Sequence, residues 1–510
     1  MPYRLITDEI PPPTETPLNA LYRHASARPD AIALIAGDDV WTYEHLAIDV
    51  ARLSNGLRRA GILPGDRITM IVRTSPMYAV FLFAAMMTGA IVAPLKTEFT
   101  AAELTELLRV QRPAVFIHEA DLQEVVSQID PAVLGHTKTF VADDHGARSW
   151  RHLMDDASRE DAVLPADIDA PCLLLATSGT TGRPKLVAYN QRVISHVAGA
   201  AKSWALTHDA CVIGSTPVAH VSGTFVMLVA MISGCREVLL SRFDADAVLD
   251  LIEEHAGTAI FLAPFLCMPL VEAQRKRARD VRSLEVCGVG GDACRAHIAE
   301  AFESTFDIQL ENTYGLTECV GSTAFGYNRR TLRGVPGRTQ LVDRNGVQVG
   351  LGEVGELHLR GPNLSLGYWT GPGDIMSHTR DGWFPTGDLM VEDADCDYRF
   401  VGRCKDLIVS DTNKISPVEV ENVLIQHGAV ADAAVAGAPD ETSGQRVVAL
   451  VKLTDKSAPA AAVADEILLW MKSRLAAFKL PEQVVIVDAI PRNALGKIDR
   501  NEVARIATLV

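Results

Sequence analysis

The sequence predicts an α/β fold: a large N-terminal body of helix-covered, mostly parallel sheets with a small β subdomain, and a small C-terminal α+β domain. Three observations predict this class. Short β-rich runs alternate with helical patterns through most of the chain, its 510 residues exceed the usual size of one domain, and 48% of them are hydrophobic. Strands separated by helices favour parallel sheets, and long chains divide into domains.

The expected body begins with runs of β-branched and apolar residues that are each followed by a helical pattern. We expect strands over 67–72, 114–117, 238–240 and 259–263, and a helix over 245–255. The repeated strand–helix order is typical of parallel sheets.

Residues 78–95 are almost wholly apolar and about as long as a minimal membrane span. Ser75 and Pro76 are typical of a helix start, and Gly89 of a helix end. These signals favour a buried helix followed by a strand over 90–93, and we expect no membrane span.

The C-terminal third changes character. A hairpin is expected over 346–360, with its turn at 350–352, and a strand over 398–401. The last hundred or so residues predict the following elements: a helix over 416–426, strands over 431–436 and 447–452, a helix over 464–475 and a strand over 483–487. We expect the alanine-rich run 457–464 to be a surface loop.

Charge and cysteine content exclude several classes of function. The 64 acidic residues outnumber the 48 basic ones, and a net charge of -16 would repel nucleic acid. The nine cysteines show no zinc-ligand spacing. The N-terminus lacks the apolar core of a signal peptide. We therefore expect free thiols in a cytoplasmic protein that binds no nucleic acid.

The most informative segment is 173–185, in which an apolar strand runs into a loop of hydroxyls and glycines that ends at Lys185. Side-chain O–H groups and unhindered backbone N–H groups there can converge on an anion. The loop lacks the GxxxxGK[ST] pattern of kinases and GTPases. The alternatives are a phosphate cradle and an ordinary surface turn.

Residues 177–185 resemble the signature TSG[ST]TGxPK of the adenylate-forming superfamily, which comprises acyl-CoA synthetases, peptide-synthetase adenylation domains and firefly-type luciferases. Four further segments are similar to motifs of that family, in the same order. They are 312–318 (YGxTE), 386–389 (TGD), 402–406 (the hinge) and 491–498 (PRxxxGKI). In character the chain resembles acyl- or aryl-CoA ligases most.

The resemblance implies an acid–thiol ligase that uses ATP, Mg²⁺ and CoA. A carboxylate attacks the α-phosphorus of ATP, giving acyl-AMP and pyrophosphate, and the acyl group then passes to a thiol. Because two anions approach each other, positive charge is needed where negative charge accumulates. By resemblance, Lys497 contacts the substrate carboxylate and the α-phosphate. An exposed structural lysine is the alternative.

The resemblance assigns further residues to the nucleotide. Glu318 would coordinate Mg²⁺ and Thr317 would bind the α-phosphate, although both could instead cap a helix. Asp388 would accept hydrogen bonds from the ribose hydroxyls, with Arg403 beside it; a turn-forming aspartate is the alternative. The remaining nucleotide-binding candidates are Thr177, Ser178, Gly179, Thr180, Thr181, Gly182 and Lys185 for the phosphates; Tyr314, Gly290, Gly291, Asp292, Asn312 and Thr313 for the adenine; and Lys405 at the hinge.

His220 matches the position at which acyl- and aryl-CoA synthetases place a histidine or aromatic residue in the acyl pocket. We assign it to orienting the carboxylate or gating the pocket, because the attacking carboxylate has no proton to lose. A structural histidine is the alternative.

One departure concerns the acyl acceptor. Thioester-forming members commonly carry Gly-Gly after the hinge, where this chain has Asp411 and Thr412. A β-branched residue has less backbone freedom than glycine and more volume, so CoA transfer is less firmly predicted than adenylation. Loading of a carrier protein is the first alternative, and a non-catalytic acyl or nucleotide sensor is the second. An oxidative, luciferase-like second step ranks last.

The substrate is expected to be a small carboxylic acid, aromatic or of medium aliphatic length. The segment around His220 carries no aspartate to hold an α-ammonium group, which disfavours an amino acid. The resemblance implies an ATP- and acyl-binding domain over 1–403 and a mobile domain over 404–510 that carries Lys497. Rotation about Lys405 would exchange Lys497 for residues near Thr412. The sequence does not indicate an oligomeric state.

Overall fold

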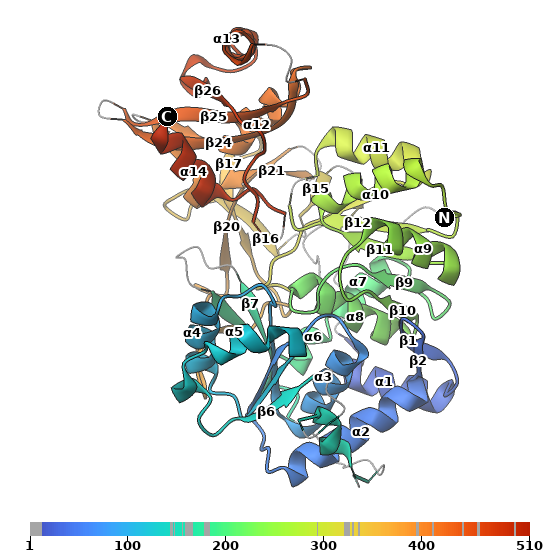
Figure 1. Cartoon of the computed structure of the whole chain (residues 1–510). Coiled ribbons are helices and arrows are strands. Elements are labelled where there is room, and N and C mark those ends of the chain that lie inside the picture. The colour runs from blue at the N-terminus through green and yellow to red at the C-terminus, as the bar shows by residue number, and fades with distance from the viewer. Residues whose placement is uncertain are drawn as a thin grey trace. The chain divides into compact units, whose positions relative to one another are not determined.

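The structure is a computed structural model that describes most of the chain, and it divides into two compact units. The described residues are 13–142, 146, 148–155, 157–158, 167–177, 184–292, 294–320, 327–328, 331–334, 337–393, 397–410, 413–440, 443–455, 459–493 and 496–510. The first unit comprises Met1–Val335 and Arg360–Phe384; the second comprises Pro336–Leu359 and Pro385–Val510. Figure 1 colours the chain from blue to red in sequence order.

The first unit contains a seven-stranded sheet of order β13-β12-β11-β9-β10-β1-β2. All neighbouring strands run parallel except β1 and β2. The strands are β1 (Ile32–Ala36), β2 (Asp39–Thr42), β9 (Cys211–Gly214), β10 (Arg236–Leu239), β11 (Ala259–Leu262), β12 (Val286–Gly290) and β13 (Leu310–Thr313). One face of this sheet is covered by α9 (Ala245–His255), α10 (Pro264–Lys276) and α11 (Ala296–Phe306) (Figure 1). Their apolar side chains share a buried cluster with its strands.

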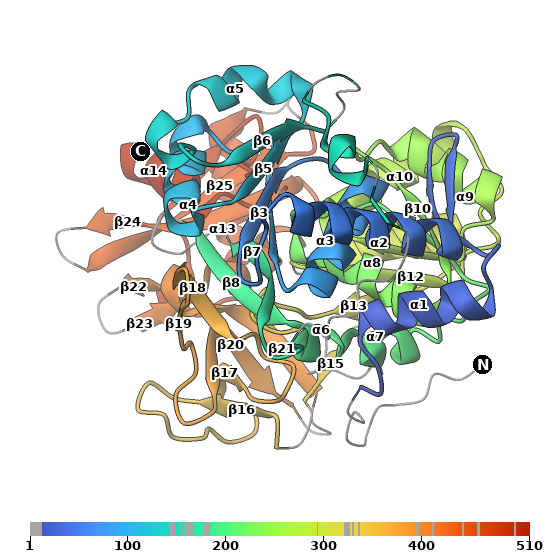
Figure 2. The same cartoon turned by 90° about the horizontal axis from the view of Figure 1, so that it is seen from below.

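An eight-stranded sheet of order β19-β18-β8-β7-β4-β3-β5-β6 completes the core of this unit. Its strands are β3 (Arg67–Ile71), β4 (Ile91–Leu95), β5 (Val115–His118), β6 (Lys138–Val141), β7 (Pro171–Thr177), β8 (Lys185–Asn190), β18 (Gly367–Gly371) and β19 (Asp374–Met376). The pairs from β7 to β6 are parallel, whereas β8, β18 and β19 pair antiparallel. Helices α4 (Ala101–Gln111) and α5 (Gln123–Ser127) pack on one face (Figure 2). The prediction of mostly parallel sheets is confirmed.

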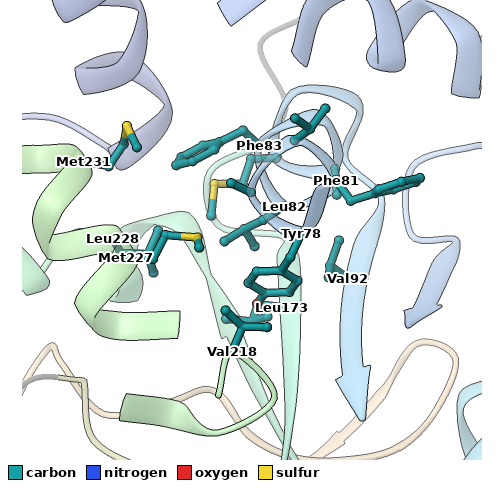
Figure 3. Close-up of a cluster of buried hydrophobic side chains, with 14 of the residues drawn as sticks. Tyr78, Phe81, Leu82, Phe83, Val92, Leu173, Val218, Met227, Leu228 and Met231 are labelled. Carbon is teal, nitrogen blue, oxygen red and sulfur yellow. The ribbon is translucent and has the colours of Figure 1, made fainter. Parts of the chain in front are cut away.

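The helices of the first unit include two that are apolar on all sides. They are α1 (Pro17–Ala27), α2 (Tyr43–Arg59), α3 (Pro76–Thr88), α4 (Ala101–Gln111), α5 (Gln123–Ser127), α6 (Gln191–Ile194), α7 (Val197–Ser203), α8 (Val221–Ser233), α9 (Ala245–His255), α10 (Pro264–Lys276) and α11 (Ala296–Phe306). Figure 3 shows side chains of α3 beside those of α8 and of strands β4 and β7. A helix that is hydrophobic all round is buried in a core, and α3 and α8 meet that expectation.

The predicted helix in the apolar stretch is confirmed as α3. Ser75 precedes it, Pro76 is its first residue, and Gly89 ends it with a φ of +77°. Every residue of α3 except Met77 is buried. Among the residues that the structure describes, no helix has both the length and the apolar character needed to cross a bilayer.

Short elements complete the first unit. They are the 3₁₀ turns η1 (Ala120–Leu122), η2 (Pro131–Val133) and η3 (Trp150–Met154), and the strands β14 (Tyr327–Asn328) and β15 (Thr331–Arg333), which pair antiparallel.

The second unit contains the strands of the predicted β subdomain in the order β21-β20-β17-β16. These are β16 (Thr339–Val342), β17 (Val354–Leu359), β20 (Phe384–Glu392) and β21 (Asp397–Arg403). The predicted hairpin is confirmed, but its first strand is β16, which precedes the expected range. Residues 350–352 lie within the connection between β16 and β17.

The C-terminal segment forms the predicted α+β pattern. Its elements are η5 (Cys404–Asp406), β22 (Ile408–Ser410), β23 (Asn413–Ile415), α12 (Pro417–Leu424), β24 (Val430–Asp440), β25 (Gly444–Leu453), α13 (Ala460–Met471), η6 (Ala477–Lys479), β26 (Gln483–Ile486) and α14 (Arg500–Leu509). Strands β24, β25 and β26 form one sheet, and α14 was not predicted.

One prediction in this segment is wrong. The alanine-rich run 457–464 is not a loop from residue 460 onward, because α13 begins at Ala460 and ends at Met471. Alanine has the highest helix propensity, and Pro459 is tolerated in front of the first turn. The expected helix over 464–475 is therefore displaced toward the N-terminus.

Candidate functional site

Two predicted adenine-binding segments lie at the same edge of the seven-stranded sheet. Gly290 ends β12, Thr313 ends β13, and the two residues are partners in parallel register. A Cβ on Gly290 would lie 2.3 Å from Oγ1 of Thr313, so only glycine allows this close approach. Gly291 follows with a φ of +83°. Ligands of open α/β sheets bind at the carboxyl ends of strands, and these segments occupy that edge.

The neighbouring residues extend this edge. Asp292 follows Gly291, Asn312 lies on β13, and Tyr314 follows β13 with a half-buried side chain. Tyr314 does not belong to the two buried hydrophobic clusters that the structure describes for this unit's core. The structure thus brings Gly290, Asn312 and Thr313 together as predicted.

Thr317 and Glu318 lie in a turn that follows β13. The turn is closed by a bridge between Leu316 and Cys319, and within the described residues 314–320 no helix starts. The helix-capping alternative for this pair is therefore excluded. The backbone N–H of Ser365 donates to the carbonyl oxygen of Glu318 (2.8 Å), so a distant segment of the chain holds the turn.

The carboxylate of Glu318 is held by Tyr368, a residue of β18 that the sequence did not indicate. The hydroxyl of Tyr368 donates to Oε1 of Glu318 at 2.8 Å. Burial raises the pKa of Tyr368, and the nearby charge of Glu318 raises it further. The hydroxyl therefore stays protonated and acts as a donor.

The predicted phosphate loop is the connection between β7 and β8. Thr177 and Lys185 are antiparallel partners at the two ends of this hairpin. Ser178, Gly179, Thr180, Thr181 and Gly182 lie outside the described residues. The ammonium group of Lys185 lies 4.4 Å from the centroid of the Tyr368 ring. Lys185 and Glu318 therefore contact the same tyrosine.

A second tyrosine links β8 to the turn. The hydroxyl of Tyr189 donates to the carbonyl oxygen of Thr317. Burial raises the pKa of Tyr189, with a further contribution from Glu318, so this hydroxyl is also a donor. Sequence spacing gave no signal for Tyr189 or Tyr368, because their roles arise from strand pairing between distant segments.

His220 is the residue before the first turn of α8. Its Nδ1 accepts a hydrogen bond from the backbone N–H of Ser222 at 3.3 Å and lies 2.7 Å from Oγ of the same residue. An Nδ1 that accepts leaves the ring proton on Nε2, a donor suited to a carboxylate. These contacts orient the ring through Nδ1, and the role of His220 at the carboxylate stays a prediction.

The loop around His220 is fixed from α3. The hydroxyl of Tyr78 lies 2.8 Å from Oγ1 of Thr224. The hydroxyl of Thr224 in turn donates to the carbonyl oxygen of Val218 at 2.6 Å. Figure 3 shows Tyr78 beside Val218. The core contact between α3 and α8 therefore positions His220.

In the second unit, Asp388 and Arg403 are brought together as predicted. They are cross-strand partners on β20 and β21, and Nε of Arg403 donates to Oδ1 of Asp388 at 2.7 Å. The side chain of Asp388 is buried within β20, which excludes an exposed turn. Lys405 is exposed in η5, directly after β21.

Lys497 lies in a tight turn before α14. The backbone N–H of Asn493 donates to the carbonyl oxygen of Lys497 (2.8 Å), and the backbone N–H of Lys497 donates to Oδ1 of Asn493 (3.2 Å). Gly496 has a φ of +69° in this turn. Lys497 is half-buried, which differs from the exposed lysine of the alternative. Asp411 and Thr412, at the predicted acceptor loop, lie outside the described residues.

Comparison with known proteins identifies the family. A family profile described as AMP-binding enzyme matches residues 21–369, well over half of the chain, and one described as AMP-binding enzyme C-terminal domain matches residues 419–497. The chain belongs to the AMP-binding enzyme family. The predicted resemblance to adenylate-forming ligases of the acyl- and aryl-CoA type is thereby confirmed.

Members of this family from several bacteria resemble the chain along nearly its whole length. A feruloyl-CoA synthase from Amycolatopsis sp is 32% identical over 95% of this chain and 97% of its own. A fatty acid–[acyl-carrier-protein] ligase, ScoC, from Streptomyces coeruleorubidus is 30% identical over 96% of each chain. The crystal structure of ATP-bound MatB from Rhodopseudomonas palustris matches with a TM-score of 0.87 and 25% identity, over 96% of this chain and 98% of that chain.

Proposed function

We propose that this AMP-binding enzyme activates a carboxylic acid with ATP to acyl-AMP, with release of pyrophosphate, and then transfers the acyl group to the thiol of CoA. The observation that carries the proposal is the shared contact of Lys185 and Glu318 with Tyr368. A cation at the end of the phosphate loop and a carboxylate that share one tyrosine support this proposal, because a metal–nucleotide complex needs both kinds of group.

The nucleotide would be held by three sets of predicted groups. In this proposal Thr177, Lys185 and the loop between them bind the phosphates, and Thr317 binds the α-phosphate. The strand ends at Gly290 and Thr313 would hold the adenine with Gly291, Asp292, Asn312 and Tyr314. Asp388 and Arg403 would receive the ribose.

The residues present fit Mg²⁺. A carboxylate oxygen is a ligand that Mg²⁺ prefers, and the ion is usually bound by one or two carboxylates together with substrate phosphates and water. Glu318 offers such a carboxylate, and in the described part of the chain no cluster of three or more His, Cys, Asp or Glu residues could hold a metal by itself. When bound, the ion would neutralise charge on the phosphates of ATP.

Lys497 and His220 would act on the acid. The ammonium group of Lys497 would stabilise the negative charge that gathers as the carboxylate attacks the α-phosphorus. Nε2 of His220, which carries the ring proton, would donate to the carboxylate and orient it. For the second step, the domain over 404–510 would rotate about Lys405 relative to the body over 1–403 and withdraw Lys497.

The acid is proposed to be aromatic or of medium aliphatic length. The relatives support both classes, since one is a feruloyl-CoA synthase and another acts on a fatty acid. The second of these loads an acyl-carrier protein, so a carrier is the alternative acceptor. The Asp411–Thr412 pair in place of Gly-Gly is the specific feature that favours this alternative.

Pyrophosphate release tests the proposal directly. The full chain is incubated with ATP and Mg²⁺ against a panel of aromatic and aliphatic acids, with CoA, with a carrier protein bearing phosphopantetheine, or with neither, and products are identified by mass. Acid-dependent release that is sustained only with CoA, with an acyl-CoA product, is the expected result. If pyrophosphate release is sustained only with the carrier protein, the carrier and not CoA is the acceptor. If no acid causes pyrophosphate release, the adenylation claim is refuted.

A further inference from the structure

Tyr368 makes two different contacts with candidate nucleotide-binding groups. Its hydroxyl donates to Oε1 of Glu318 at 2.8 Å, and its ring lies 4.4 Å from the ammonium group of Lys185. The three residues come from the turn after β13, from β18 and from the start of β8. Tyr368 is therefore the point at which the ends of three distant segments meet.

Several contacts fix the tyrosine itself. Its backbone pairs with Val187 of β8 on one side and Met376 of β19 on the other. The ring of His378 stands edge-on to the Tyr368 ring, with centroids 5.6 Å apart, and Nε2 of His378 lies 2.6 Å from Oγ of Ser365. Because Ser365 also holds the backbone of Glu318, the tyrosine and the glutamate are anchored to the same short segment.

The hydroxyl contact determines how Glu318 is presented. A hydrogen bond to one carboxylate oxygen restricts the rotation of the group and leaves the other oxygen for a further ligand. Oε1 is bound to Tyr368, and among the described residues no protein group donates to Oε2. Oε2 is thus the oxygen offered to a cation.

The ring contact determines the position of Lys185. A lysine and a glutamate that meet directly form an ion pair. The ammonium group is then less available to the phosphates, and the carboxylate is less available to the metal ion. The aromatic ring attracts the ammonium group by a cation–π interaction without consuming the carboxylate. Tyr368 therefore keeps Lys185 near Glu318 and separates the two charges.

We propose that Tyr368 is a positioning residue for the metal–nucleotide complex: its hydroxyl orients Glu318 toward Mg²⁺, and its ring holds Lys185 for the phosphates. The inference rests on the proposed function, since it deepens the role of the same site.

Two substitutions separate the hydroxyl from the ring. Tyr368→Phe removes only the hydroxyl, and Tyr368→Leu removes both. The readout is binding of α,β-methylene-ATP, measured calorimetrically with MgCl₂ titrated in and, separately, in EDTA. Tyr368→Phe is expected to raise the Mg²⁺ concentration at half-saturation about tenfold, the lower end of the usual cost of losing a hydrogen bond to a metal ligand. Nucleotide binding in EDTA is expected to be unchanged. Tyr368→Leu is expected to weaken binding in EDTA as well.

Two further variants make the test decisive. Lys185→Met keeps the ring and the hydroxyl, and it is expected to reproduce the loss in EDTA without changing the Mg²⁺ requirement; it replaces Tyr368→Leu if that variant does not fold. Tyr398→Phe is the matched control, because the hydroxyl of Tyr398 also donates to a glutamate, Glu392, at 3.4 Å. It is expected to behave as the unchanged protein.

A Tyr368→Phe protein with the original Mg²⁺ requirement would overturn the inference, as would a wild-type protein whose nucleotide binding does not respond to Mg²⁺. Failure of the proposed function gives a different result. If the wild-type protein binds the nucleotide with Mg²⁺ but releases no pyrophosphate with any acid, the activity is refuted, and the binding comparison still decides the role of Tyr368.

Discussion

The guanidinium group of Arg500 donates to the carboxylate of Glu421, with Nη2 3.0 Å from Oε2. Glu421 is buried on α12, and its Oε1 also accepts the backbone N–H of Val435 on β24 at 2.8 Å. Arg500 is the first residue of α14 and follows Lys497 by three positions. This ion pair therefore ties the turn that carries Lys497 to a helix and a strand of the C-terminal sheet.

Substitution of Arg500 by Met is expected to destabilise the C-terminal segment and to lower adenylation. Glu421 would keep a buried charge without its cation, which costs about 3 kcal/mol or more. Calorimetric unfolding measures the stability, and acid-dependent pyrophosphate release measures the activity. Arg505→Met is the control on the same helix, because Arg505 pairs with Glu502 on the surface and no measurable change is expected. Equal effects of the two variants would contradict this role of Arg500.

Substitution of Lys497 by Ala is expected to lower adenylation at least about 100-fold, the usual cost of one transition-state donor. The fold and the affinity for α,β-methylene-ATP should be unchanged, because the turn is held by the backbone of Lys497 and the side chain of Asn493. The measurements are pyrophosphate release, calorimetric binding and circular dichroism. Lys472→Ala, at an exposed position after α13, is the matched control. Adenylation at the original rate would remove Lys497 from the mechanism.

Substitution of Gly290 by Ala is expected to raise the Kd for nucleotide about tenfold. The added Cβ would lie 2.3 Å from Oγ1 and 2.7 Å from the carbonyl oxygen of Thr313, so β13 must shift at the strand end. Overpacking of this kind costs about 1–3 kcal/mol. Gly428→Ala is the control, since a Cβ there meets nothing within 4 Å. If both variants bind nucleotide like the unchanged protein, the strand ends do not hold it.

Local signals in the sequence are sufficient to predict elements whose first and last residues are typical helix starts and ends. Ser75, Pro76 and Gly89 bracket α3, and the prediction of that helix is confirmed. The alanine run after Pro459 lacks apolar periodicity, and its composition was interpreted as a loop although alanine favours helix. The helix propensity of alanine therefore decides the structure of this run.

The site could be predicted only where its residues belong to motifs that resemble those of the family. Asp388 and Arg403 were expected side by side, and cross-strand pairing confirms that arrangement. Tyr368 could not be found in this way, because its contact with Glu318 joins residues 50 positions apart. Such a contact depends on the pairing of β18 with β8, a tertiary relationship that no local pattern encodes.

We expect the stability of the fold to depend on pH through Glu237, a residue of β10 outside the site. Its carboxyl is buried, Oε2 has no hydrogen-bond partner among the described residues, and burial raises its pKa to about 8. Between the ordinary value of 4.5 and about 8, the folded chain keeps a proton that the unfolded chain releases. Stability from this group therefore falls as pH rises through that window, by up to about 1.4 kcal/mol per pH unit.

Substitution of Glu237 by Gln removes the titrating group and retains its shape. The variant is expected to lose less stability than the unchanged protein between pH 5.5 and about 8 and to be the more stable of the two at the upper end. Urea unfolding across this range is the measurement. Burial raises the pKa of the neighbouring Cys235 to about 12, so that thiol does not titrate in the window. Identical slopes for the two proteins would show that Glu237 is ionised in the folded chain.

Substitution of Lys405 by Pro is expected to separate the two half-reactions. Lys405 is exposed in η5 between β21 and β22, so the change disturbs no buried side chain. Proline fixes φ and restricts the preceding residue, which would oppose the proposed rotation about this residue in the second step. Acid-dependent pyrophosphate release in a single turnover should persist, whereas thioester formation should fall. Lys405→Arg keeps the charge and the backbone freedom and should retain both steps. Unimpaired thioester formation in the proline variant would exclude rotation about this residue. Unfolding measurements on both variants distinguish a loss of fold from a loss of motion.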